Sequence, residues 1–219
     1  TALKIITQNG FDRLDEDLDQ IGRLEQRRKE ILETNANPLD KALQLLDDCR
    51  RYGTLPFAHI ARAGFVAFTL LRSAVSSRLI TQERQEVFMG SLQTVAKQFA
   101  FDCDSVLDGR LTNQKFISEY GHLRPGTYEI TSDRYDSDPD RFLKPKTQSL
   151  RDVSHAVGFI WSEEERSGIE ENLKLDGFEL SLEELEQFMR KAIEGRESAK
   201  FLFTRNLSEA LELLATWGI

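Results

Sequence analysis

The chain has 219 residues, of which 40% are hydrophobic and 30% charged, so it is long enough to bury a substantial core. Its 37 acidic and 29 basic residues give a formal net charge of −8, which provides no general attraction to nucleic acid or to an anionic membrane. The two cysteines, Cys49 and Cys103, are too few for a disulfide framework, and we expect reduced thiols in a cytoplasmic protein.

The sequence begins with neither a methionine nor the basic and apolar pattern of a signal peptide. We therefore expect the chain to be a segment of a longer cytoplasmic protein. The most apolar run, 55–75, is interrupted by His59, Arg62 and Arg72, which favours a core helix over a membrane span.

The first part of the chain has the periodicity of helices. A helix over about residues 14–32 is charged on most faces, so we interpret 1–33 as a possible arm that packs on something outside the chain. Asn37 followed by Pro38 is typical of a helix start, and leucines at helical spacing come after them.

A tight corner between two helices is expected close to residue 53. Gly53 is predicted to end one helix and Pro56 to begin the next. That next helix, over about 55–77, is apolar nearly all round, which is typical of a helix at the centre of a bundle.

Two more helices are predicted before residue 121. One begins at Thr81 and carries a single apolar stripe, and Thr112 caps a short helix that runs to Tyr120. The residues of the stripe are Phe88, Leu92, Val95 and Phe99.

Helices resume in the last third of the sequence. A serine followed three residues later by a glutamate has the spacing of a capping box, and this occurs at Ser162 with Glu165 and at Ser181 with Glu184. Apolar faces then mark one helix and a separate last helix: Leu185, Phe188, Met189 and Ala192, and Leu207, Leu211 and Leu214.

Between these groups lies a long loop, about 121–147, whose first part contains glycine, proline, tyrosine, histidine and arginine. Glycine and proline prescribe a defined backbone path, and long loops with a defined shape are often functional. The fold class is therefore all-α: a single helical domain over 1–219, a bundle of roughly seven or eight helices with one long structured loop.

The motifs of common catalytic and cofactor sites are missing from the sequence. The histidines, His59, His122 and His155, are far apart and have no metal-ligand spacing. No phosphate-binding glycine loop and no nucleophile elbow occurs. We assign no catalytic residue, no metal and no cofactor to this chain.

Three segments carry the candidate binding residues. In the loop, His122, Arg124, Tyr128 and Arg134 either converge on a ligand or fasten the loop to the bundle. Arg62, one turn after His59 on an apolar helix, requires either a carboxylate or a bound anion if it is buried. The remaining pair, Arg196 and Lys200, share a helix face that is either solvated or holds an acid or a phosphate.

These segments resemble the central helical region of phosphoenolpyruvate-utilising phosphotransferases, the relatives of phosphoenolpyruvate synthase, pyruvate phosphate dikinase and rifampicin phosphotransferase. The most specific is Tyr-Gly-His-Leu-Arg-Pro-Gly-Thr-Tyr-Glu-Ile-Thr-Ser-Asp-Arg-Tyr-Asp at 120–136. Its companions are Arg-Tyr-Gly-Thr-Leu-Pro-Phe-Ala at 51–58, Ala-Arg-Ala-Gly-Phe at 61–65 and Glu-Gly-Arg-Glu-Ser-Ala-Lys-Phe at 194–201. The resemblance spans nearly the whole chain.

The resemblance implies a parent kinase or phosphotransferase that uses ATP and Mg²⁺. In such an enzyme an ATP-grasp-like domain binds nucleotide. A phosphohistidine on a swivelling domain passes phosphoryl between ATP or phosphoenolpyruvate and a small-molecule acceptor. This chain resembles the helical domain, so we expect it to be inactive alone and to partner those two domains of the same polypeptide. The threonine and paired glycines that precede the phosphohistidine surround none of the histidines here.

The resemblance makes this chain an acceptor-binding or docking domain. His122, Arg124, Tyr128 and Arg134 then form part of the acceptor or docking surface, with Arg62, Arg196 and Lys200 in the same cleft. The alternative is a non-catalytic helical interaction module whose motif loop is structural; a stand-alone binding protein is a third possibility. Arginines that converge on an open cleft favour the first interpretation, and arginines paired with carboxylates inside the bundle favour the second.

Overall fold

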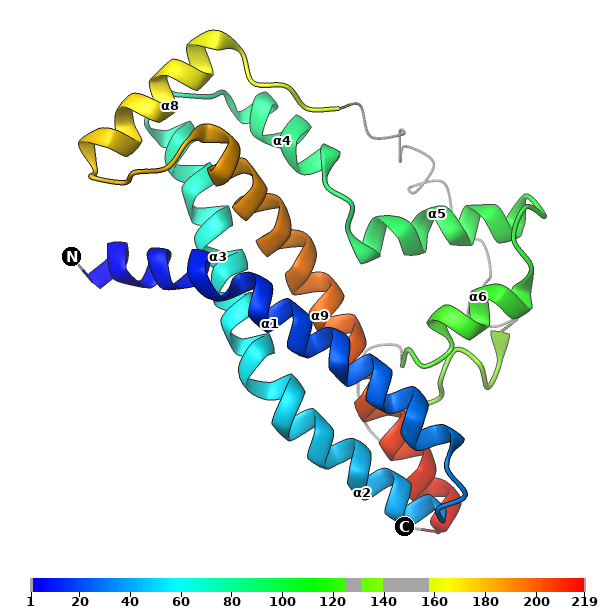
Figure 1. Ribbon diagram of the computed structural model, residues 1–219. Coiled ribbons are helices and arrows are strands. Elements are labelled where there is room, and N and C mark those ends of the chain that lie inside the picture. Colours follow the sequence, from blue (N-terminus) through cyan, green and yellow to red (C-terminus); the bar gives the residue numbers. More distant parts are fainter. Residues whose placement is uncertain (1, 125–130, 140–157, 219) are drawn as a thin grey trace.

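The computed structural model describes residues 2–124, 131–139 and 158–218, with side chains from residue 10 onward. Within these ranges every regular element is a helix (Figure 1), which confirms the predicted all-α fold. The elements in chain order are α1 (Ala2–Glu33), α2 (Pro38–Asp48), the π-helix η1 (Cys49–Gly53), α3 (Thr54–Ser76), α4 (Gln82–Ser91), α5 (Val95–Leu107), α6 (Asn113–Tyr120), α8 (Glu163–Leu175) and α9 (Leu182–Trp217).

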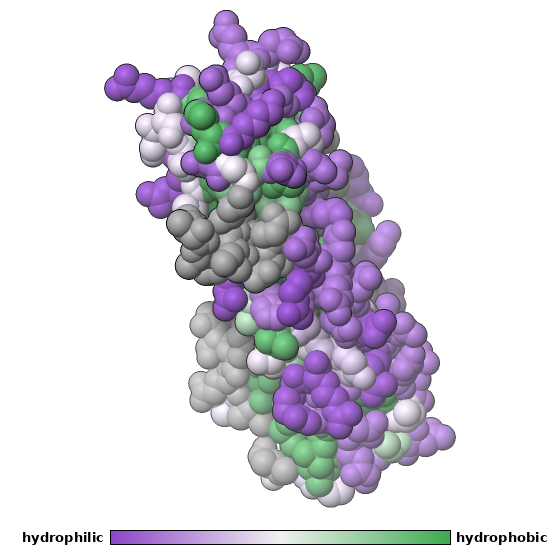
Figure 2. Space-filling model, turned by 60° about the vertical axis from the view of Figure 1, so that its left-hand side comes forward, coloured by the Kyte–Doolittle hydropathy of each residue, from purple (hydrophilic) through white to green (hydrophobic). Residues whose placement is uncertain are grey.

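The centre of the molecule is a bundle of α1, the α2–α3 rod and α9, which lie alongside one another in Figure 1. Helices α4, α5 and α6 follow one side of α9, and α8 lies near the end of the bundle where α9 begins. The main apolar core of this centre draws on α1, α3 and α9, and its buried residues include Leu14, Ile21, Ile60, Ala67, Phe188 and Ala192. On the face shown in Figure 2, hydrophilic residues predominate and hydrophobic patches lie between them.

Helix α1 is part of this bundle from residue 10 onward. Leu14, Ile21, Leu24 and Ile31 recur at helical spacing and are all buried, and α1 packs against α3 and α9. The segment interpreted as a possible arm therefore has an apolar face of its own. This face is hard to recognise in the sequence because charged residues surround it, and in the structure α3 and α9 of the same chain cover it.

The expected corner at Gly53 does not exist. A π-helical turn at Cys49–Gly53 joins α2 to α3, so that the two run on as one rod. Gly53 keeps a helical backbone, and the Phe203 ring of α9 fills the space where a side chain would begin. Pro56, which has no amide to donate to the helix, lies three residues after the end of this π turn.

Helix α3 is also less central than its composition suggests. Ile60, Ala67 and Leu71 are fully buried, but Leu55, Phe65 and Phe68 of the same helix are exposed. The continuous run Pro38–Ser76 is long and apolar enough to span a membrane by composition alone, a test that core helices of soluble proteins also pass. Of these exposed residues of α3, Phe65 lines the candidate site described below.

The helix predicted from Thr81 is two helices. Thr81 caps α4 as expected, but α4 ends at Ser91, Leu92 is extended, and Thr94 caps a new helix, α5. The prediction of one continuous helix with a single stripe was wrong, because apolar residues can keep a helical spacing across a break between two helices. Thr112 caps α6, as predicted.

Helix α9 replaces the two helices expected at the C-terminal end. It runs without interruption for 36 residues. Gly195 lies within the helix without breaking it. An added Cβ at this position would lie 2.8 Å from Leu18, so the glycine allows α1 and α9 to pack closely. Both predicted capping boxes are confirmed, with Ser162 at the start of α8 and Ser181 at the start of α9.

Candidate functional site

A groove of about 690 Å³ opens between α3, α5, α6 and α9, and we call it the aromatic groove. Its lining combines a large aromatic surface with a few charged groups. The residues are Phe57, Ala61, Phe65, Val95, Ala96, Phe99, Tyr120, Leu123, Tyr135, Arg196, Glu197, Lys200, Phe201 and Thr204. Mostly apolar walls with a few polar groups are typical of small-molecule sites.

One wall of the groove is held in place by carboxylates of α9. Glu194 accepts a hydrogen bond from the backbone amide of Gln93 at 2.7 Å, and Glu197 accepts one from Ala96 at 3.4 Å. These amides precede and begin α5, where a helix has amides with no partner of their own. The glutamates therefore fix the position of α5 over α9.

The opposite end of the groove is a cluster of rings. Phe99 packs edge-on against Tyr120 with centroids 5.0 Å apart, and Tyr135 lies 6.0 Å from Phe99. The Tyr120 hydroxyl donates to Asp102 at 2.7 Å, and burial beside this carboxylate raises the pKa of the phenol. Tyr120 is therefore a neutral, fixed part of the wall.

The cationic groups of the groove are Arg196 and Lys200, one turn apart on α9. The Arg196 guanidinium lies 5.2 Å from the centre of the Phe65 ring. Neither residue forms an ion pair with a carboxylate in the described part of the chain. This pair, predicted to share a helix face, is thus available to an anionic group in the groove.

The arginines of the loop have a different role, because they fasten the loop to α9. Arg124 is buried and binds Glu212 at 3.1 Å, the Ser208 hydroxyl at 3.3 Å and the carbonyl of Ser132. Arg134 binds Asp136 at 2.6 Å and Glu209 at 3.4 Å. Both guanidinium groups are therefore occupied within the protein.

His122 lies beneath the loop rather than at the surface. It is 3% exposed, its ring packs edge-on against Phe201 at 4.7 Å, and its backbone carbonyl accepts from Ser208. Burial, together with the positive charges of Arg205 and Arg134, lowers the pKa of the imidazole to about 3. Its ring nitrogens have no hydrogen-bond partner among the described residues. His122 is thus a neutral packing residue beside the groove.

The remaining candidates lie elsewhere. Arg62 lines a separate cavity between α1 and α3, and Tyr128 lies outside the described residues. The structure therefore brings Arg196 and Lys200 together, uses Arg124 and Arg134 to fasten the loop, buries His122 and puts Arg62 at another site.

Sequence reasoning missed the aromatic lining, above all Phe65, Phe99 and Phe201. Phe65 belongs to the helix expected at the centre of the bundle, and Phe99 to the apolar stripe expected on a single helix. Phe201 could have been found from the sequence, since it is the last residue of the segment 194–201, which also contains Arg196 and Lys200.

The described residues of the groove hold no nucleophile paired with a base. Burial raises the pKa of the Cys49 thiol to about 12 and that of Cys103 to about 11, so both are inert at neutral pH. Across the described ranges, no three histidine, cysteine or acidic side chains are close enough to hold a metal ion. The arrangement can bind and orient a ligand, and its cations can stabilise negative charge.

Comparison with known proteins gave no match to a protein-family model, to a curated protein or to a solved structure. The family resemblance therefore stays a prediction from the motif segments of the sequence.

Proposed function

We propose that this chain is the acceptor-binding helical domain of a phosphoenolpyruvate synthase-like phosphotransferase, and that the acceptor lies in the aromatic groove. One observation carries the proposal: all the segments that resemble this family contribute to the same groove. The segments 51–58 and 61–65 supply Phe57 and Phe65, the segment 120–136 supplies Tyr120 and Tyr135, and 194–201 supplies its cations and Phe201.

The chemistry of the groove suits such a role. Aromatic walls bind an apolar acceptor by burial and ring packing. Phosphoryl transfer depends on positioning and on cations around developing negative charge, and it needs no nucleophile from the acceptor domain. Arg196 and Lys200 are the groups that would meet an incoming phosphoryl at this surface.

The first experiment follows phosphoryl transfer in the full-length parent protein. The histidine domain is labelled from radioactive ATP and chased with pyruvate, water alone or a panel of aromatic alcohols. The double variant Arg196→Met with Lys200→Met is expected to slow acceptor-dependent loss of label by about 100-fold. Histidine labelling itself, which involves other domains, should not change.

Arg72→Met is the matched control, because Arg72 is an exposed arginine of α3 that does not line the groove. Equal rates of label loss in the control and in the double variant would overturn the proposal. So would a parent protein that takes up no label from ATP or phosphoenolpyruvate.

A second experiment uses the isolated chain and an anionic aromatic dye, anilinonaphthalene sulfonate. Phe65→Ala is expected to weaken dye binding about tenfold, since Phe65 is an apolar wall of the groove. Leu175→Ala removes a similarly exposed apolar side chain from α8 and should have no effect. Equal binding by the two variants would place the dye elsewhere.

The alternative is a non-catalytic interaction module with a structural loop. The ion pairs of Arg124 and Arg134 with α9 favour it for the loop arginines. The labelling experiment separates the two interpretations, because an interaction module has no acceptor-dependent step for the groove variant to slow.

A further inference from the structure

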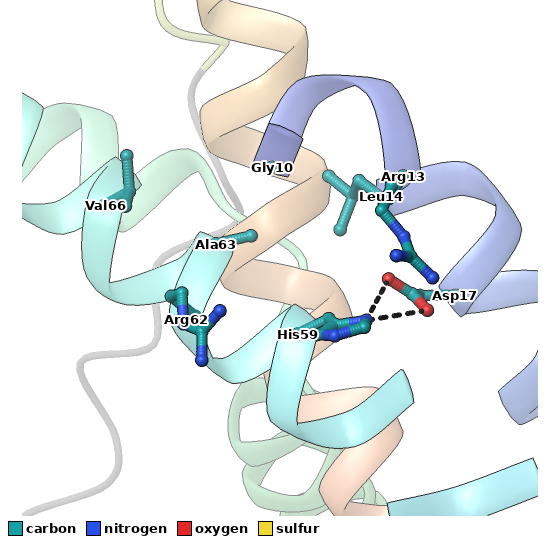
Figure 3. A pocket seen from close by; sticks show the side chains of 8 residues that line it. All are labelled: Gly10, Arg13, Leu14, Asp17, His59, Arg62, Ala63 and Val66. Atoms are coloured by element: carbon teal, nitrogen blue, oxygen red, sulfur yellow. Dashed lines mark hydrogen bonds and ion pairs between the residues drawn. The ribbon is translucent and has the colours of Figure 1, made fainter. Parts of the chain in front are cut away.

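We propose that the cavity between α1 and α3 is a second binding site, one that takes a small oxyanion such as a phosphate or carboxylate group. The cavity has a volume of about 280 Å³, and none of its described lining residues also lines the aromatic groove. Figure 3 shows its polar residues projecting from the two helices, Arg13 and Asp17 from α1, and His59 and Arg62 from α3.

A buried carboxylate and a histidine form the back of the cavity. Asp17 is 4% exposed, and its carboxylate oxygens lie 3.2 and 3.3 Å from Nδ1 of His59. A carboxylate can only accept, so Nδ1 carries the proton of this hydrogen bond. This hydrogen bond fixes the His59 ring. Its other nitrogen, Nε2, has no hydrogen-bond partner among the described residues.

The cavity also contains two arginines without a carboxylate partner in the described part of the chain, Arg13 and Arg62. Arg13 precedes Asp17 by one helical turn, and Arg62 follows His59 by about one turn, so each helix supplies a guanidinium and one member of the hydrogen-bonded pair. In Figure 3 Arg13 lies beside Asp17, and Arg62 lies on the other side of His59.

Both arginines are exposed, and neither pairs with an acidic side chain of the described residues although the chain has a net charge of −8. Many other arginines of the protein, including Arg27, Arg84, Arg134 and Arg205, are held by acidic side chains. The cavity thus carries more positive than negative groups on an acidic protein. This is the charge pattern that attracts an anion to a concave site.

The donors match a small oxyanion. Guanidinium groups present paired N–H donors that suit the oxygens of phosphate and carboxylate. The cavity is less than half the size of the aromatic groove, and four of its eight described lining residues are charged or polar, so it suits a phosphate or carboxylate group better than an aromatic ring.

Isothermal titration of the isolated chain with inorganic phosphate, and separately with acetate, tests this site. The ionic strength is held constant with sodium chloride. Saturable binding of at least one of the two anions is expected, and the tighter of the two identifies the preferred oxyanion. Arg13→Met and Arg62→Met should each weaken it about tenfold or more.

Arg72→Met again serves as the control, since Arg72 is an exposed arginine of α3 away from the cavity. Circular dichroism shows whether each variant retains its helices, and Arg62→Lys keeps a cation for any variant that unfolds. No saturable binding beyond the effect of chloride, or equal binding by the Arg62→Met and Arg72→Met variants, would overturn the proposal. The Arg196→Met variant separates this site from the aromatic groove. Phosphate binding that survives in Arg196→Met and is lost in Arg62→Met belongs to the cavity, and the reverse result would overturn the proposal.

Discussion

At the scale of single residues, Arg124 shows how a candidate ligand residue can be a structural one. Its side chain is 2% exposed, and its partners come from the loop and from α9. A buried guanidinium requires such partners, because an unpaired charge away from water is costly.

The first prediction concerns the variant Arg124→Met. Removing the guanidinium leaves the Ser132 carbonyl and Glu212 without their partner, so the free energy of unfolding should fall by about 2–3 kcal/mol. Urea denaturation measures this change. A residue that served only to bind an acceptor would leave stability unchanged on replacement, and that result would contradict the structural role.

The second prediction concerns His122 and pH. The pKa of its imidazole is about 3 in the folded protein and 6.5 in the unfolded chain. Between these two pH values the unfolded chain binds a proton at His122 and the folded protein does not. The effect is absent above pH 6.5 and grows as the pH falls toward 3. It amounts to about 2 kcal/mol of lost stability between pH 7 and pH 5.

The variant His122→Leu should lose this part of the pH dependence. Urea denaturation of both proteins at pH 7 and pH 5 compares them in a range above the usual pKa of carboxylates. Parallel losses of stability in the two proteins would show that His122 titrates normally in the folded state.

At the scale of the elements, local signals predicted helix starts well and helix ends poorly. The caps at Thr81, Thr112, Ser162 and Ser181 formed as expected, because a cap is made by residues within one turn of each other. The break at Leu92 was missed. The amides it frees are satisfied by Glu194 and Glu197, about a hundred residues later in the chain.

The third prediction concerns the π turn at Cys49–Gly53. A Cβ at Gly53 would lie 2.5 Å from the Phe203 ring, so Gly53→Ala should force α9 to shift and cost about 1–3 kcal/mol of stability. Gly22→Ala in α1 is the control. Nothing lies within 4 Å of its added Cβ, and it should stabilise the helix by about 0.5–1 kcal/mol. Equal thermal midpoints for the two variants would contradict the close approach of Phe203.

At the scale of the whole molecule, the long helices form a frame on which the sites lie. Helix α9 takes part in the core, in the aromatic groove and in the fastening of the loop. The aromatic groove and the cavity near His59 both use α3, but they lie on different sides of it and pair it with different helices.

The candidate residues show the same division between local and distant information. The sequence alone placed Arg196 and Lys200 on one helix face, because a spacing of four residues decides this locally. It left open whether the loop arginines bind a ligand or fasten the loop. Their partners, Glu209 and Glu212, lie on a helix far along the chain.

By itself the sequence determined the all-α class, the main helices and most of their caps, since these depend on periodicity and on contacts within a turn. Only the tertiary structure decided that α2 and α3 form one rod, that the family-like segments share one groove, and that Arg62 belongs to a different cavity. Each of these depends on side chains brought together from distant parts of the chain, for which local spacing carries no information.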